Sequence, residues 1–240
     1  MRLIIVRHGE PDYEHDSLTE KGRREAELLS KRLCNTEVTA FYSSPLGRAV
    51  ATSKPTLEKL GRTAEILPWL QEFPACRIDE KTGEAIFMWD ILPEEWTAKK
   101  EYYDRDRWLE EATVALGNGK AEYEKVASGL DALLARHGYV RDGELYRVER
   151  ENRDTLVLFC HFGVEMVILS HLFGISPMVL WHSFTALTSS VTTVYTEERK
   201  KGVAIFRCAG FGDISHLYAA GEPASFFARF CETYSSDERH

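Results

Sequence analysis

The chain has 240 residues, of which 44% are hydrophobic and 28% are charged, and its formal net charge is −8 at pH 7. This length and apolar content suit one large α/β core and exclude a disordered chain. The acidic balance argues against a general nucleic-acid binder, so an anionic substrate would need locally clustered arginines.

The N-terminal residues, the apolar runs and the cysteines bear on the compartment and the partners of this protein. The first residues enter an apolar strand at once, so we expect no signal peptide, and no apolar run reaches the roughly 18 residues of a membrane span. We therefore expect a cytoplasmic protein with no membrane and no nucleic-acid partner. Five widely spaced cysteines without a C-x-x-C pair are expected to be free thiols: Cys34, Cys76, Cys160, Cys208 and Cys231.

The first 70 residues alternate between strands and helices. Residues 3–6 read Leu-Ile-Ile-Val, a continuous apolar run typical of a strand buried on both faces. Ser17 and Thr19 offer helix-start hydroxyls, and apolar residues then recur at helical spacing as far as Leu33. Further strands are predicted over residues 38–42 and 64–67, with a helix between them that starts near Pro45.

Residues 75–150 interrupt this alternation. Residues 75–115 hold three tryptophans and two tyrosines among many charges, which predicts a cap over the site, since aromatic rings suit apolar pocket walls. An ordinary helical excursion with partly buried aromatics is the alternative. A helix is predicted over 119–137 and an edge strand over 144–149. The aromatics are Trp89, Trp96, Tyr102, Tyr103 and Trp108.

The core pattern resumes with an apolar strand over residues 155–160 and a helix over 164–173. Two more strands, over 190–195 and 203–207, precede a last helix near 224–231. No internal repeat or linker divides the chain. The alternation predicts one domain over residues 1–240, a three-layer α/β/α sandwich with a mostly parallel central sheet and a cap inserted at 75–150.

Two predicted strands end in histidine. Arg7 and His8 follow the first strand, and His161 follows the strand at 155–160. Open α/β sheets bind ligands beyond the carboxyl ends of their strands, where a neutral imidazole can be a nucleophile and a guanidinium can hold phosphate. Arg48 lies about one turn into a helix whose N-terminus attracts anions. Alone, the segment at Arg7 and His8 could equally be a solvated turn; with the other residues it predicts a phosphate pocket.

These motifs resemble those of the histidine phosphatase superfamily, also called the phosphoglycerate mutase-like family. The resemblance covers most of the chain outside residues 75–150. It rests on Arg7-His8-Gly9-Glu10, Leu18-Thr19-Glu20-Lys21-Gly22, Ser43-Ser44-Pro45-Leu46-Gly47-Arg48-Ala49, His161, Ser189-Ser190-Val191-Thr192 and Asp213-Ile214-Ser215-His216-Leu217. It implies that His8 is a nucleophile that becomes phosphohistidine, that Arg7 and Arg48 clamp the phosphoryl oxygens, and that His161 steadies the transferring group.

The proton donor for the leaving group is less well defined by the sequence. The resemblance favours Glu72, in a Leu-x-Glu context after the third strand, but the glycine common in the family is replaced by Phe73-Pro74-Ala75. Glu84 is therefore a competitor. We expect Glu10 to orient its loop rather than to catalyse.

The remaining histidines and the absence of a metal motif complete the site prediction. His15, His171 and His182 are expected at the surface or in packing, although His15 lies in the loop after the nucleophile. No metal or cofactor is predicted, since there is no H-E-x-x-H motif or tight His/Asp cluster.

Departures from the family pattern favour hydrolysis over mutase chemistry. The loop after Arg7-His8-Gly9 is short and lacks the tryptophan of phosphoglycerate mutases, and Phe162 stands where glycine is usual. We expect a metal-independent phosphomonoesterase acting on a small organic phosphate, with an apolar or ring-bearing leaving group. The alternatives are a phosphoglycerate mutase or bisphosphatase and a non-catalytic phospholigand-binding protein. The oligomeric state is open, with a homodimer as one option.

Overall fold

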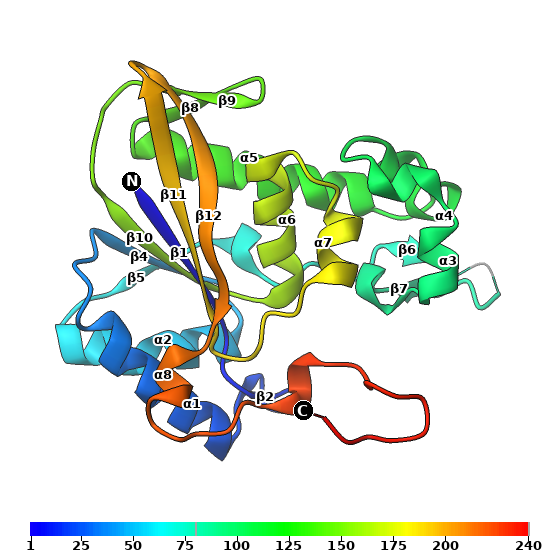
Figure 1. Cartoon of the computed structure of the whole chain (residues 1–240), viewed down its shortest axis with the longest axis horizontal. Helices are drawn as coiled ribbons and strands as arrows, with labels where there is room; N and C mark the ends of the chain where they lie inside the picture. Colours follow the sequence, from blue (N-terminus) through cyan, green and yellow to red (C-terminus); the bar gives the residue numbers. More distant parts are fainter. Residues whose placement is uncertain (80, 240) are drawn as a thin grey trace.

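An eight-stranded mixed sheet forms the centre of the computed structural model, which describes residues 1–79 and 81–239 (Figure 1). The strand order is β5-β4-β10-β1-β11-β12-β9-β8, in which the first four strands are parallel and the others pair antiparallel. The strands are β1 (Arg2–Arg7), β4 (Ala40–Ser43), β5 (Ala64–Ile66), β8 (Tyr139–Asp142), β9 (Leu145–Val148), β10 (Thr155–Cys160), β11 (Val191–Lys200) and β12 (Val203–Asp213). The predicted α/β fold with parallel core strands is confirmed.

Helices flank this sheet and short elements connect them. The α-helices are α1 (Glu20–Leu33), α2 (Gly47–Leu60), α3 (Pro93–Thr97), α4 (Ala112–Ala115), α5 (Gly119–Arg136), α6 (Phe162–Phe173), α7 (Pro177–Ser183) and α8 (Ser215–Tyr218). Two small hairpins pair β2 (Pro11–Asp12) with β3 (Ser17–Leu18) and β6 (Arg77–Ile78) with β7 (Ala85–Ile86). Turns of 3₁₀ helix cover Pro68–Leu70, Met88–Asp90, Lys100–Tyr103, Arg107–Glu110 and Phe226–Ala228. No helix in the described part of the chain is both long and apolar enough to cross a membrane.

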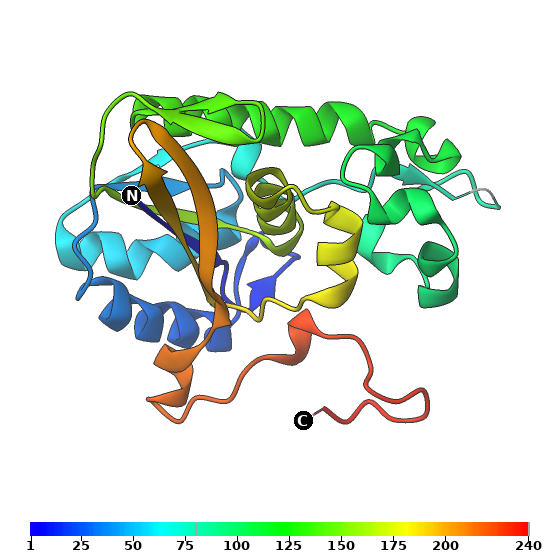
Figure 2. The ribbon, with the colours of Figure 1, turned by 45° about the horizontal axis from the view of Figure 1, so that its top comes forward.

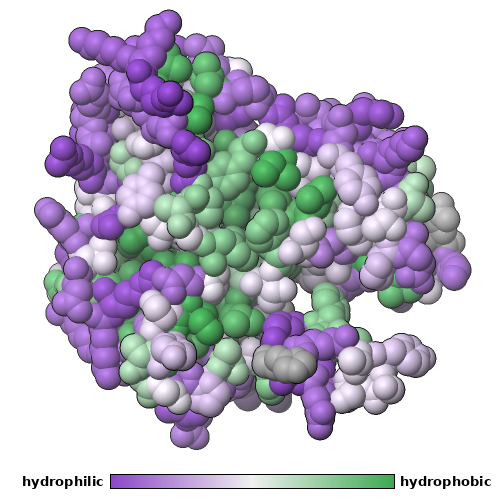
Figure 3. Space-filling view, in the orientation of Figure 1, coloured by the Kyte–Doolittle hydropathy of each residue, from purple (hydrophilic) through white to green (hydrophobic). Residues whose placement is uncertain are grey.

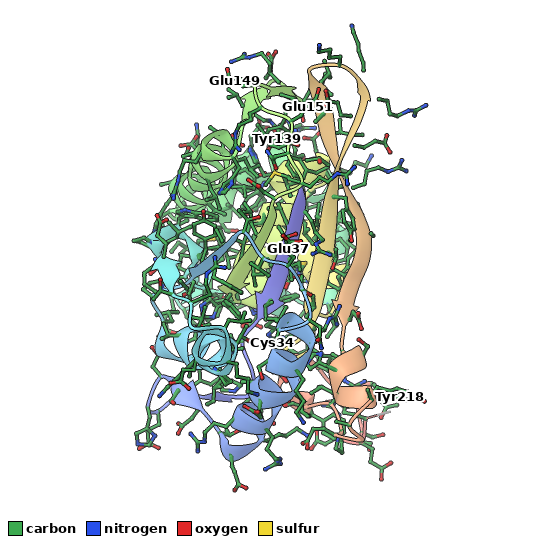
Figure 4. The ribbon with its side chains drawn as sticks, turned by 90° about the vertical axis from the view of Figure 1, so that its left-hand side faces the viewer. Cys34, Glu37, Tyr139, Glu149, Glu151 and Tyr218 are labelled. Carbon is green, nitrogen blue, oxygen red and sulfur yellow. The ribbon has the colours of Figure 1, made fainter. Side chains whose placement is uncertain are left out.

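The three layers follow from the alternation of side chains along the strands. In β1, Leu3 and Ile5 belong to the core cluster that includes α5, α6 and α7, whereas Ile4 and Val6 belong to the cluster with α1 and α2. A strand with a period of two presents successive side chains to opposite faces, so a fully apolar strand needs cover on both. Figure 2 shows α5 on one side of the sheet and α1 with α2 on the other, and Figure 4 shows the layers from a second direction.

The predicted edge strand at 144–149 is wrong in its position. It is β9, which lies between β12 and β8, and β8 forms the edge. The second half of the predicted 75–150 insertion therefore extends the main sheet, with α5 packed beside β8. The cap-like part is the set of short elements before α5. The order of strands in a sheet is set by pairing between segments that are far apart in the chain, and a local sequence pattern does not predict that pairing.

The predicted helix near 224–231 is also wrong, since that segment contains a single 3₁₀ turn. The apolar residues at this spacing are Phe226, Phe227 and Phe230, which remain 57%, 56% and 70% exposed. A short helix is stabilised mainly by burying an apolar face against the rest of the protein. The phenylalanines do not gain that burial here.

The cap aromatics divide between core and surface. Trp108 and Tyr102 are fully buried, and Trp108 packs edge-on against Trp181 of α7. Trp96 stacks on His182 with ring centroids 4.8 Å apart. These two tryptophans therefore pack with α7 in a shared core. Of the three cap tryptophans, Trp89 is the one that lines the site described below.

Candidate active site

The carboxyl ends of β1 and β10 bring two histidines together. The strands run parallel with Arg7 beside Cys160, and the backbone N–H of His8 donates to the carbonyl of Cys160 at 3.0 Å. The rings of His8 and His161 are consequently 5.0 Å apart between centroids. Both side chains are almost completely shielded from solvent.

The hydrogen bonding of His8 fixes which ring nitrogen can react. Its Nδ1 lies 2.7 Å from the carbonyl oxygen of Gly9, which can accept but not donate. The hydrogen therefore sits on Nδ1, and Nε2 carries the lone pair. Burial, followed by the charge of Arg7, holds the pKa of His8 well below its usual value. His8 is thus a neutral imidazole with a free nucleophilic nitrogen.

His161 is held by Ser44. Its Nε2 lies 2.8 Å from the hydroxyl oxygen of Ser44, which also accepts a bond from the N–H of Leu46. The other ring nitrogen, Nδ1, is a buried atom without a hydrogen-bond partner in the described residues. Burial, with the neighbouring His8 and arginines, also holds the pKa of His161 well below its usual value.

Two arginines are each held at one end. Nη1 of Arg7 donates to the carbonyl of Ala186 at 2.6 Å, and Nη1 of Arg48 donates to Asp16 Oδ1 at 2.8 Å. The Nε atoms of both arginines are buried without a hydrogen-bond partner in the described residues. Buried donors of this kind are costly unless a ligand satisfies them. An anion with several oxygens would do so.

Asp16 supports this arrangement from the loop before α1. While one of its carboxylate oxygens holds Arg48, the other accepts from the N–H of Gly47 at 2.6 Å, at the start of α2. A Cβ atom at Gly47 would lie 2.0 Å from the Asp16 carbonyl oxygen, so glycine is required for this close approach. The carboxylate therefore fixes the arginine relative to the helix N-terminus.

Glu72 lies beside these groups with one oxygen engaged. Its Oε1 accepts from the backbone N–H groups of Phe73 and Val164 at 2.8 and 3.2 Å. Burial raises the pKa of Glu72, while these bonds and the charge of Arg7 oppose the rise. A Cβ at Gly163 would come 2.7 Å from Glu72 Oε1 and 2.3 Å from the ring of Trp89, so this glycine allows both to approach. A carboxyl with a raised pKa suits a proton donor.

A cavity of about 190 Å³ adjoins Arg7 and Glu72. Most of its wall is aromatic, contributed by the loop after His8, the cap, α6 and the C-terminal segment. The lining residues are Arg7, Tyr13, Glu72, Trp89, Phe162, Phe227, Arg229 and Phe230. A site with anion-binding groups at one end and rings at the other can bind an ester of phosphate with an organic alcohol.

A family model described as histidine phosphatase superfamily (branch 1) matches residues 3–207. The chain belongs to this superfamily. Phosphoserine phosphatase 1 from Hydrogenobacter thermophilus is 26% identical over 210 residues, which cover 83% of this chain and 89% of that protein. A 2,3-bisphosphoglycerate-dependent phosphoglycerate mutase from Thermoplasma acidophilum is 38% identical over 61 residues, 21% of this chain and 30% of its own length.

The fold is shared with solved members of the superfamily. A phosphoserine phosphatase variant from Entamoeba histolytica, solved in complex with phosphoserine, superimposes with a TM-score of 0.61 at 19% identity. The match covers 90% of this chain and 98% of that one. The resemblance inferred from the sequence motifs is thus confirmed at the level of family and fold.

Within the histidine phosphatase fold, the predicted site residues converge. Arg7, His8, Glu72 and His161 meet at the strand ends, and the charge of Arg48 acts on both histidines and on Glu72. Glu84 lies exposed in the β6–β7 turn, outside the lining of the cavity. Of the two carboxyls that the sequence offers as proton donor, the structure therefore brings Glu72 to the cavity and leaves Glu84 outside it.

Glu10 and the remaining histidines named in the sequence analysis form hydrogen bonds within the fold. The Glu10 carboxylate accepts from the hydroxyls of Thr19 and Ser225. His15 is exposed and bonds to Asp12, whereas His171 bonds to Asp131. His182 bonds to the carbonyl of Met88. Across residues 1–79 and 81–239, no group of three His, Cys, Asp or Glu side chains is arranged to hold a metal ion.

Ser189 and His216 support His8 from the backbone side, a role that the sequence did not reveal. The N–H of Ser189 donates to the carbonyl of His8 at 2.9 Å, and its hydroxyl pairs with His216 Nε2 at 3.0 Å. Ser189 has a φ of 57°, an uncommon left-handed conformation for a residue with a side chain. Both residues stand in the motifs that carry the family resemblance, and those motifs are the sequence signal for them.

Glu165 was also missed. It is 1% exposed in the first turn of α6, and burial raises its pKa to about 7 against the effects of the Thr192 hydroxyl and Arg7. A single acid among the apolar residues of 164–169 is the sequence signal for it. When this buried carboxyl is ionised, its negative charge acts on the nearby Arg7.

Proposed function

We propose that this member of the histidine phosphatase superfamily is a phosphomonoesterase that works through a phosphohistidine on His8. The observation that carries the proposal is the 2.7 Å bond from His8 Nδ1 to the Gly9 carbonyl, which leaves Nε2 bare. The charges of Arg7 and Arg48 act on this ring and the ring of His161 lies beside it, and each of these three residues has a buried nitrogen that lacks a partner in the described residues. An anionic phosphoryl group supplies the acceptors that the unpaired arginine N–H groups need.

The first chemical step transfers the phosphoryl group to the protein. Nε2 of His8 attacks phosphorus, the bond from phosphorus to the ester oxygen breaks, and Glu72 gives its proton to the departing alcohol. Charge on the transferring group is spread over its equatorial oxygens. Arg7, Arg48 and His161 stabilise that charge without a metal ion.

The second step returns the histidine to its starting state. The Glu72 carboxylate, now deprotonated, accepts a proton from a water molecule that attacks phosphorus, and the phosphorus–nitrogen bond breaks. Inorganic phosphate leaves and Glu72 is again protonated. One carboxyl thus serves as acid and then as base, consistent with its raised pKa.

A phosphoglycerate mutase is the second candidate, favoured by the local similarity to the Thermoplasma acidophilum mutase. A mutase must retain and re-use the phosphohistidine rather than admit water. Activity that depends on a bisphosphoglycerate primer would identify it. The short loop between Gly9 and Thr19 favours the hydrolase.

The test is phosphate release from a panel of phosphomonoesters, phosphoserine included, with excess EDTA present. We expect release that persists in EDTA, is inhibited by vanadate and falls to background in His8→Ala. His15→Ala is the matched control, because His15 is an exposed histidine of the same loop. Full activity in His8→Ala, or loss of activity in EDTA, would overturn the proposal.

A further inference from the structure

The C-terminal strap, which we define as residues 222–230, passes over the mouth of the site. It leaves α8, whose Tyr218 points away from the body (Figure 4), and runs beside β2 (Figures 1 and 2). Lys21 Nζ donates to the carbonyl of Pro223 at 2.7 Å, and the Ser225 hydroxyl donates to Glu10 Oε2 at 2.6 Å. Ser225 is 2% exposed. The strap is therefore tied to the loop that follows the nucleophile.

This attachment places strap aromatics against the site. Ser225 Oγ accepts from the N–H of Phe227, which starts the 3₁₀ turn. The ring of Phe227 then lies edge-on to Tyr13, with centroids 6.3 Å apart. Phe230 lines the same cavity. In the space-filling view the C-terminal segment and the cap project from the body on either side of a notch (Figure 3).

The opposite wall comes from the cap and α6. Trp89 packs edge-on to Phe162 at 5.8 Å and is backed by the stacked ring of Phe87 at 4.9 Å. The Arg7 guanidinium lies 5.7 Å from the Phe162 ring centre, which joins this wall to the phosphate end. Phe162 is the residue that departs from the family's glycine, and the structure gives it a place in the wall.

The cavity between these walls has room for one ring. Its volume is about 190 Å³, and an apolar cavity of about 150 Å³ is large enough to bind benzene. Tyr13, Phe227 and Phe230 nevertheless keep more than half of their surface exposed. Rings grouped this way around a polar floor are typical of a ligand site.

We propose that this cavity is the leaving-group site and that it selects phosphate monoesters whose alcohol carries a single planar ring. The proposal rests on the proposed function, because Arg7 and Glu72 at the floor define which end holds the phosphate. Aromatic walls favour a flat ring over a saturated one, since offset and edge-to-face contacts need a π face. Arg229, which is ion-paired with Glu232, completes the rim.

The catalytic test compares benzyl, cyclohexylmethyl and propyl phosphate, whose alcohols are all poor leaving groups of similar acidity. We expect kcat/KM for benzyl phosphate to exceed that for propyl phosphate at least tenfold, which corresponds to 1.4 kcal/mol. Cyclohexylmethyl phosphate should fall between them, because it fills the cavity without a π face. Equal values for the three esters would overturn the ring selectivity and leave the phosphatase function standing.

Two leucine variants test the strap. Phe227→Leu should reduce the ratio of benzyl to propyl kcat/KM at least threefold. Phe226→Leu is the matched control, since Phe226 is its neighbour in the same turn, is equally exposed, and is not part of the cavity wall. Its ratio should match that of the unaltered chain. A ratio that is unchanged in Phe227→Leu would contradict the role of the strap.

A binding measurement separates failure of this inference from failure of the proposed function. Benzylphosphonate and propylphosphonate cannot be hydrolysed, and their dissociation constants follow from titration calorimetry. We expect tighter binding of benzylphosphonate by at least tenfold, with the difference reduced in Phe227→Leu. If no ester is hydrolysed yet this preference holds, the proposed function fails and the ring site stands; equal affinities refute the ring site.

Discussion

Replacing Glu72 with glutamine tests the assignment of the proton donor. The amide carbonyl of glutamine can keep both bonds that Oε1 accepts, from the N–H groups of Phe73 and Val164. The fold should therefore be retained, with a change in unfolding free energy below about 1 kcal/mol. What is lost is the transferable proton, and general acid catalysis contributes about 10²- to 10⁴-fold to the rate.

The leaving group decides how much of that loss is seen. For an alkyl phosphate, kcat/KM of Glu72→Gln should fall by about 10²- to 10⁴-fold, because an alkoxide cannot leave without a proton. For p-nitrophenyl phosphate, whose phenolate leaves unaided, the fall in kcat/KM should be less than about tenfold. The comparison uses kcat/KM because this ratio reports phosphoryl transfer to His8 and not the later attack of water, in which Glu72 acts again for every substrate. Steady-state phosphate release at a fixed pH gives both numbers. Glu84→Gln is the matched control and should change neither rate, because Glu84 is exposed outside the cavity.

If Glu72 is the proton donor, the direction in which the rate changes with pH can be predicted. Burial raises the pKa of Glu72, so its protonated form persists to higher pH than that of an ordinary glutamate. With alkyl esters, kcat/KM should fall as pH rises through this raised pKa, and that alkaline limb should be absent in Glu72→Gln. Equal losses on both substrates, or an unchanged alkaline limb in the variant, would refute the reasoning.

Three further predictions concern residues that surround the site. Asp16→Asn removes the ion pair to Arg48 and should raise the Ki of vanadate by about tenfold, since a charged hydrogen bond contributes about 1.5–3 kcal/mol. Ser189→Ala should be about 1 kcal/mol less stable than Ser189→Gly in thermal unfolding, because glycine adopts a positive φ without strain. Folding raises the pKa of Glu165 from 4.5 to about 7, so the folded chain holds the extra proton and stability falls as pH rises through that window. Glu165→Gln should remove up to about 3 kcal/mol of that fall, measured by urea unfolding near pH 4.5 and well above pH 7.

Much of the site could be predicted because its residues stand at the ends of buried strands. The apolar runs before His8 and His161 are local signals, and parallel strands place their carboxyl ends at one edge of the sheet. Arg48 was predictable from its position one turn into a helix. These residues need no knowledge of distant packing to be recognised.

What could not be predicted depends on contacts between segments far apart in the chain. Asp16 acts by folding onto the start of α2, 31 residues away. Trp108 and Trp89 belong to one aromatic-rich stretch, yet one is buried against α7 and the other lines the cavity. The spacing of Phe226, Phe227 and Phe230 is that of one face of a helix. The segment is instead an extended strap, attached through the hydrogen bonds of Ser225 to Glu10 and of the Pro223 carbonyl to Lys21.

Trapping the phosphorylated protein tests the central claim most directly. The chain is mixed with a ³²P-labelled ester, quenched within a turnover in alkali, and mapped by peptide sequencing after proteolysis. We predict one label on His8, stable in alkali and lost in acid as expected of a phosphorus–nitrogen bond, and absent from His8→Ala. A label on another residue, or a label that survives in His8→Ala, would contradict the account.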